Sequence, residues 1–218
     1  MHRRIRLTVF IAVTCAVCTQ VAADSQPDDG LLPPIMQLPD TVPPSNGSKE
    51  MITTLRVARV PIVLEKTELK DVQRRLGGRI RARGDASEAI AWLCFCGTDT
   101  NGRWALWLES GELAGLDLID GFTWQRLDAN ARTEGRCRMI PDGDDGIELP
   151  IALRLGLTEM QVRKILGSPT LRYRGTLYFS HEYKHTIRNE PYTVYNDVTV
   201  ALRDGLVWAI RVSKDSEN

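Results

Sequence analysis

The sequence predicts an α+β fold of two tandem lobes, each a short helical segment packed on an antiparallel β-sheet. A weak internal repeat supports two lobes, because residues 61–78 align with residues 150–169 and each copy has the spacing of a short amphipathic helix that stops at glycine. Each copy is followed by segments in which apolar and polar residues alternate, which is typical of strands that bury one face. One face of each sheet is then expected to pack on the helix and the other to face solvent.

The first 23 residues have the pattern of a secretory signal peptide. Arg3, Arg4 and Arg6 precede an uncharged stretch of 17 residues, and Val21-Ala22-Ala23 supplies the small residues that a signal peptidase needs. We therefore expect cleavage after Ala23 and a periplasmic or secreted protein. A membrane anchor is the alternative interpretation, since the stretch is at the short limit for crossing a bilayer.

Residues 24–50 are predicted to form a tether. This segment contains six of the eleven prolines of the chain, together with Gly, Ser, Asn and Asp, a composition that favours an extended and poorly packed chain. The first lobe is expected at residues 51–126, a linker rich in Gly, Asp and Arg at 127–146, and the second lobe at 147–218.

Each lobe is predicted to begin with a capped helix. In the first lobe Thr67 is the expected N-cap, and the helix is expected to stop at Gly77-Gly78. In the second lobe Thr158 is the expected N-cap and Gly167 the stop. The apolar stripes that would face the sheet are Leu69, Val72 and Leu76 in one helix and Val162, Ile165 and Leu166 in the other.

The strand pattern also predicts which side chains share a sheet face. If Leu93, Phe95, Leu106 and Leu108 face the helix, then Trp92, Cys94, Ala105 and Trp107 lie on the other side. The second lobe would present Tyr178, Ser180, Thr199, Arg203 and Arg211 on the equivalent surface. Aromatic and Arg side chains are over-represented among binding hot spots, so this open face is the predicted protein-binding site, with Trp92, Trp107, Tyr178, Arg203 and Arg211 as its candidate residues. A register error of one residue would move all of them to the opposite face.

Three cysteines follow the signal peptide: Cys94, Cys96 and Cys137. An oxidising compartment favours one disulfide with one thiol left over. Cys94 and Cys96 point to the same side of an extended segment and are poorly placed to bond to each other, so we expect Cys137 to pair with one of them. No spacing among the three is diagnostic of zinc or of a redox site.

The segment His181-Glu182-Tyr183-Lys184-His185 matches the H-E-x-x-H pattern of zinc peptidases. The two His bind one metal only when a helix places them one turn apart, whereas the flanking residues here are strand formers. A zinc peptidase is therefore a minor alternative, and we expect neither a metal site nor catalytic residues.

Charge and motifs exclude several classes of partner. The 28 Lys and Arg balance 28 Asp and Glu, and loss of residues 1–23 leaves 25 basic and 28 acidic residues, a net charge of −3. No nucleic-acid partner is expected from this balance. No Walker, dinucleotide or nucleophile-elbow motif occurs, so no small-molecule cofactor is expected.

The residues 155–169, LGLTEMQVRKILGSP, followed by strands and by VALRDGLV at 200–207, resemble the SmpA/OmlA family of BamE-like outer-membrane assembly proteins. The resemblance covers residues 147–213. Two such lobes in tandem are similar to the secreted β-lactamase inhibitory proteins, which present a concave sheet to a partner enzyme. The resemblance implies a binding module and not a catalyst.

These observations together predict a non-enzymatic protein of the bacterial envelope that binds a protein partner, as a scaffold in outer-membrane assembly or maintenance. Association with the membrane is expected only through that partner. The alternative is a proteinaceous inhibitor or immunity protein for a secreted hydrolase.

Overall fold

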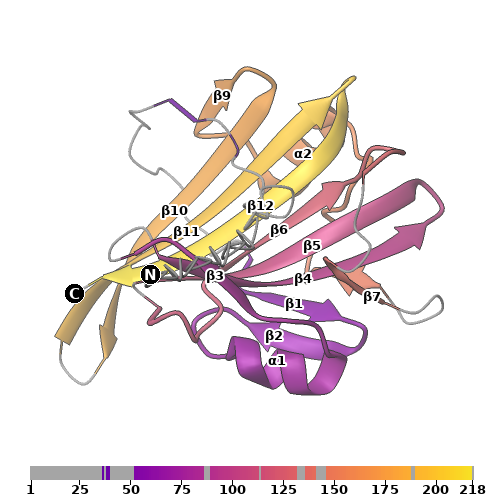
Figure 1. The fold of residues 1–218 in the computed structure, drawn as a ribbon. Coiled ribbons are helices and arrows are strands. Elements are labelled where there is room, and N and C mark those ends of the chain that lie inside the picture. Colours follow the sequence, from indigo (N-terminus) through magenta and orange to yellow (C-terminus); the bar gives the residue numbers. More distant parts are fainter. Residues whose placement is uncertain are drawn as a thin grey trace, which may run out of the picture. The chain divides into compact units, whose positions relative to one another are not determined.

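Two antiparallel sheets and two short helices make up the described part of the chain in a computed structural model (Figure 1). The structure describes residues 36, 38–39, 52–85, 89–112, 114–131, 136–140, 146–187 and 190–217. All of them belong to one unit, residues 31–218. The predicted signal peptide and nearly all of the predicted tether lie outside the described residues. Within the described ranges, no helix has the length and apolar character that a membrane span requires.

The larger sheet contains nine strands, eight of which follow one another edge to edge. In spatial order they are β3 (Arg81–Arg83), β4 (Ile90–Asp99), β5 (Gly102–Gly111), β6 (Gly121–Arg126), β12 (Leu206–Glu217), β11 (Glu190–Arg203), β10 (Thr176–Ile187) and β9 (Leu171–Tyr173). Neighbours in this order are antiparallel. The short β7 (Arg138–Met139) pairs with β4 in parallel.

The predicted α+β fold of two tandem lobes is wrong, because the structure is mainly one continuous antiparallel sheet. The physical reason is the pairing of β6 with β12, in which residues 121–125 bond to residues 213–209. Each half of the chain would otherwise end in a strand edge with unpaired N–H and C=O groups, and here the two edges satisfy each other. The two helices have only eight residues each.

A smaller sheet and the helices contribute to the core on one face of the large sheet. The small sheet has the order β2 (Val60–Val63), β1 (Thr54–Val57) and β8 (Ile147–Glu148). The helices are α1 (Leu69–Leu76) and α2 (Glu159–Leu166). One apolar cluster joins all these layers and includes Leu55 and Ile62 from the small sheet, Val72 and Val162 from the helices, and Leu93, Leu106, Phe122, Ile210, Val198 and Leu177 from the large sheet.

The helix boundaries agree with the sequence, with one exception at a cap. Thr158 caps α2 through a capping box, in which its side chain accepts from the Gln161 N–H and the Gln161 side chain accepts from the Thr158 N–H. Gly167 ends α2, as predicted. Thr67 does not cap α1, because the N-cap is Glu68 and the Thr67 hydroxyl instead accepts a bond from the Val63 N–H at 2.9 Å.

The predicted alternation along β4 and β5 is confirmed. Leu93, Phe95, Leu106 and Leu108 belong to the main core, whereas Trp92, Cys94, Cys96, Ala105 and Trp107 form a separate buried cluster. We call the side of the large sheet that carries the second cluster the second face. Because the alternation continues through paired strands, the second face extends from β4 to β10.

Candidate functional site

A row of five directly paired residues crosses the second face. Trp107 on β5 pairs with Thr123 on β6, Thr123 with Arg211 on β12, Arg211 with Thr199 on β11, and Thr199 with Tyr178 on β10. Directly paired residues in antiparallel strands have their Cβ atoms about 4.5–5.5 Å apart on the same side of the sheet. The β6–β12 junction therefore brings together three of the predicted binding residues, Trp107, Arg211 and Tyr178.

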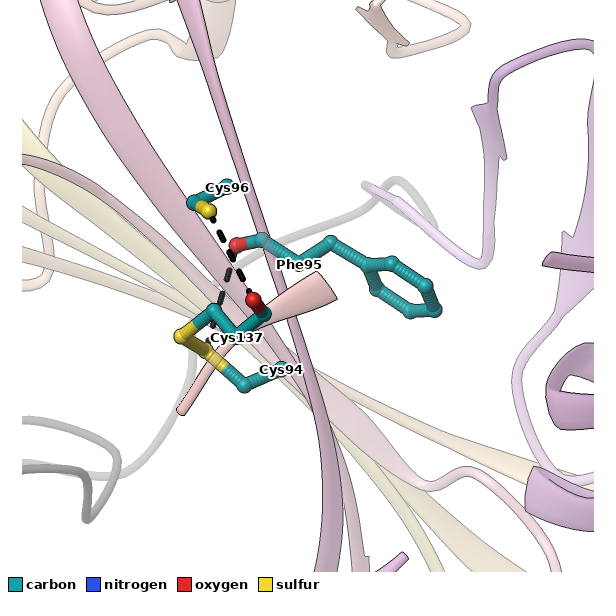
Figure 2. Close-up of a disulfide and its surroundings, with 4 residues drawn as sticks. All are labelled: Cys94, Phe95, Cys96 and Cys137. Carbon is teal, nitrogen blue, oxygen red and sulfur yellow. Dashed lines mark hydrogen bonds between the residues drawn. A yellow bond between two sulfur atoms is a disulfide. The ribbon is translucent and has the colours of Figure 1, made fainter. Parts of the chain in front are cut away.

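A disulfide closes one end of this row. Cys137 pairs with Cys94, one of the two pairings that the sequence left open, with the two Cα atoms 4.6 Å apart (Figure 2). Cys96 keeps a buried thiol outside the disulfide, and its Sγ lies 3.9 Å from the Cys137 carbonyl oxygen. The bond attaches the segment before β7 to the second face, directly beside Trp107.

Both tryptophans of the predicted site lie on the second face, but neither is open to solvent. Trp92 is 5% exposed and Trp107 is 4% exposed. Ile90, Leu127 and Cys137 pack against the cluster that contains them. The expectation of an exposed aromatic surface is therefore wrong at these two positions and at Tyr178, which is 9% exposed, whereas the role of these residues in binding stays a prediction.

Next to Trp107 the second face holds a buried carboxylate. Glu109 is 3% exposed, and its Oε1 accepts a 2.5 Å bond from the Thr123 hydroxyl while its Oε2 accepts a 3.2 Å bond from Arg211 Nη2. Burial raises the pKa of Glu109, and the Arg211 charge and the Thr123 bond oppose that rise. The carboxylate thus orients Arg211, whose side chain remains 39% exposed.

A cavity of about 510 Å³ opens beside this pair and is lined largely by acidic and small residues. Burial raises the pKa of Asp120 to about 7, and the nearby Asp215 and Glu109 add to the rise, while a 2.7 Å bond from the Gly111 N–H opposes it. Burial also raises the pKa of Asp215. Burial and mutual repulsion both disfavour the ionised forms of these carboxyl groups. A cation placed nearby would therefore stabilise the ionised forms.

Tyr178, at the far end of the row, is buried to 9% exposure and interacts with Ser180 and Asp197. Burial is the main reason why the pKa of Tyr178 rises to about 12, and burial likewise raises the pKa of Asp197. Asp197 pairs with Ser180 and with Ser213 across the neighbouring strands, so it belongs to the same face. This end of the row is polar, in contrast to the tryptophan end.

Arg203 lies apart from the row, where β11 turns into β12. Its guanidinium stacks 4.1 Å from the centre of the Trp208 ring and pairs with Asp128 at 2.7 Å. A register shift between Ala201 and Leu202 separates this end from the regular pairing. The structure therefore brings together four of the five predicted residues on one face and leaves Arg203 at its margin.

The H-E-x-x-H segment lies within β10, as the flanking strand formers predicted. A strand does not place two His at positions four apart beside one metal ion, so the geometric basis of the zinc-peptidase alternative is missing. Among the described residues, no group of three or more His, Cys, Asp or Glu is arranged to hold a metal.

Sequence reasoning missed the acidic residues of the second face. Glu109 offered one signal, because it is a charged residue at a position that the alternation assigns to the side of Trp107 in an otherwise apolar strand. Asp120 and Asp215 offered none, since 95 positions of sequence separate them and only the β6–β12 junction brings them to one cavity. A second cavity of about 1020 Å³, lined by Trp104, Trp124 and the Asp99–Arg126 pair among others, also went unpredicted.

Comparison of the chain with models of protein families, with curated proteins and with solved structures found no match. The resemblance to the SmpA/OmlA family therefore stays a prediction that rests on residues 155–169 and 200–207.

Proposed function

We propose that the chain is an exported protein of the bacterial envelope that binds a protein partner through the second face of its large sheet. The observation that carries this proposal is the open part of the second face, where the Arg211 side chain is 39% exposed, is held by Glu109 and lies beside the cavity that Asp120 and Asp215 line. A face built from paired strands is rigid, and a rigid surface binds with little loss of conformational entropy.

Charge indicates what the partner presents. Glu109, Asp120, Asp197 and Asp215 lie on or beside the second face, where Arg211 pairs with Glu109. Burial raises the pKa of each of these carboxyls, so each would gain from a positive charge placed nearby. The surface is therefore complementary to a partner that presents Lys or Arg side chains.

The test uses the double substitution Asp197→Asn, Asp215→Asn. Both side chains are on the second face and only partly buried, so the amides should fold normally while removing two negative charges. The wild-type protein is first used to retain proteins from an envelope extract, and mass spectrometry identifies them. We expect an identified partner to bind the double variant at least about tenfold more weakly than the wild type in calorimetry. Replacing Trp107 by Ala is unsuitable, because losing a buried ring is expected to cost about 3–5 kcal/mol of stability.

Asp117→Asn together with Asp204→Asn is the matched control, since both residues are exposed and the loss of charge is the same. Binding that falls equally in the two double variants would show a net-charge effect and contradict the proposal. Retention that neither variant changes would place the binding surface elsewhere.

The inhibitor alternative predicts a different result in the same experiment. A single secreted hydrolase would be retained in a stoichiometric complex and would lose activity on binding. Barrel proteins or their assembly machinery in the retained fraction would instead support a scaffold.

A further inference from the structure

One edge of the large sheet carries five arginines from separate segments of the chain. Arg75 lies in the last turn of α1, Arg79 follows that helix, Arg83 is on β3, and Arg136 and Arg138 precede and begin β7. We call these five residues the arginine edge. All five are exposed. No lysine is among them, although Lys and Arg both occur elsewhere on the surface.

The fold brings these residues together from separate segments. β3 and β7 both pair with β4, at residues 90–92 and 95–96 respectively, on the side of β4 that β5 does not occupy. The end of α1 touches the same edge, because a Cβ atom added to Gly77 would lie 3.5 Å from Arg138 Nε. Arg81, between Arg79 and Arg83, is also on β3 and pairs with Trp92.

The arginine edge is not neutralised by its neighbours. Within the ranges that the structure describes, no carboxylate pairs with Arg75, Arg79, Arg83, Arg136 or Arg138. Asp71 is engaged by Arg74 instead. Like charges concentrated in this way repel one another, so the edge is complementary to an external surface of negative charge.

An exposed apolar side chain lies within the same edge. Met139 follows Arg138 on β7 and is 54% exposed, one of the three most exposed large apolar residues in the described chain. Arginine forks match phosphate oxygens in pairs, and a methionine side chain beside them can enter the acyl region below the headgroups. We propose that the arginine edge docks this protein directly on a surface of anionic phospholipid.

A lipid surface fits the observations better than a protein does. The arginines are spread along the edge of a sheet and over both of its sides, and a bilayer presents phosphates at many positions, so it needs no shape complementary to that edge. Contact of this kind is direct, unlike the association through a partner that the sequence predicted.

The experiment measures co-sedimentation of the full chain with vesicles. Vesicles of phosphatidylcholine mixed with phosphatidylserine are compared with vesicles of phosphatidylcholine alone, which measure the binding that does not depend on an anionic headgroup. The test variant is Arg75→Gln, Arg79→Gln, Arg83→Gln, whose side chains are exposed and unpaired among the described residues. We expect the binding that depends on phosphatidylserine to fall about a hundredfold, and to fall in the wild type when salt is raised.

The matched control is Arg154→Gln, Lys164→Gln, Lys184→Gln, which removes the same charge from exposed positions away from the edge. This control should bind as the wild type does. Equal losses in both triple variants, or no preference for phosphatidylserine, would overturn the proposal. Binding to a soluble polyanion such as heparin without binding to vesicles would overturn it as well, because the edge would then serve a charged polymer or protein.

Discussion

At the scale of single residues, the main feature of the second face is the buried carboxyl group of Glu109 and the two side chains that bond to it. Burial alone would favour the neutral acid, and the Thr123 hydroxyl and the Arg211 guanidinium act in the opposite direction. Removing one partner of such a group costs more than the contact itself is worth, since the other partner is left buried and unpaired. The three side chains should therefore be regarded as one unit.

Asp120 gives the clearest prediction at this scale. Burial raises its pKa from 3.8 to about 7, so the folded state binds this proton more tightly than the unfolded state does. The stability that protonation provides is full below the unfolded pKa of 3.8 and is lost as the pH rises through about 7. Asp120→Asn keeps an acceptor for the Gly111 N–H and should raise the free energy of unfolding at neutral pH by up to about 4 kcal/mol, with a flatter pH profile.

Urea unfolding measured from below pH 4 to above pH 7 would check this expectation. Asp117→Asn serves as the control, because Asp117 is exposed and lies outside the cavity. If the free energy of unfolding of the Asp120→Asn variant changed with pH as steeply as that of the wild type, another group would be responsible for the pH dependence.

At the scale of elements, the two helices show how the same pattern can be completed in different ways. α2 has a full capping box at Thr158 and Gln161, whereas α1 has Glu68 as its N-cap and no side-chain cap. The Thr67 hydroxyl, just before α1, instead accepts a hydrogen bond from the Val63 N–H in the preceding turn. A threonine before an amphipathic stretch therefore predicts a helix start to within about two residues, but not the bond that the hydroxyl makes.

Thr158→Ala is expected to lower the free energy of unfolding by about 1 kcal/mol, because the Gln161 N–H loses its acceptor. The midpoint of thermal or urea unfolding would measure this loss. Met160→Ala is the control on the same helix, since Met160 is 79% exposed and alanine is a good helix former. Equal stability of the Thr158 variant and the wild type would show that the cap contributes nothing to α2.

At the scale of the whole molecule, the pairing of β6 with β12 decides the architecture. It joins strands from both halves of the chain, and it creates the row from Trp107 to Tyr178 and the cavity beside Asp120 and Asp215. The Cys94–Cys137 disulfide adds a second long-range constraint at the β4 end, across a sequence separation of 43 residues. Both constraints act on the same face.

Removing the disulfide should destabilise the whole fold. For a loop of this length, Cys94→Ala with Cys137→Ala is expected to lower the free energy of unfolding by about 2–4 kcal/mol, mainly because the unfolded chain gains freedom. Urea unfolding under non-reducing conditions measures the difference. Cys96→Ala should retain the disulfide by mass spectrometry and cost under about 1 kcal/mol, as a small change in volume. A comparable loss in the Cys96 variant would show that the thiol, and not the bond, supports this region.

Local pattern alone predicted the position of α2, strand segments within β4, β5, β10, β11 and β12, and the side of the sheet on which Leu93, Phe95, Leu106 and Leu108 lie. Capping residues, glycine stops and period-2 alternation act over a few residues, so they can be read without knowing the fold. Trp92 and Trp107 were placed on the correct face for this reason. The same pattern predicted that Cys137 would pair with Cys94 or Cys96, but only the register of the segment before β7 selected Cys94.

Tertiary structure alone decided that the two halves form one sheet, that both tryptophans are buried, and that Glu109, Asp120 and Asp215 share one region. The arginine edge is of the same kind, since β3, β7 and the end of α1 meet only because each contacts the region of β4. Strand pairing across distant segments depends on which edges are left unsatisfied after local structure has formed, and no short-range pattern contains that information.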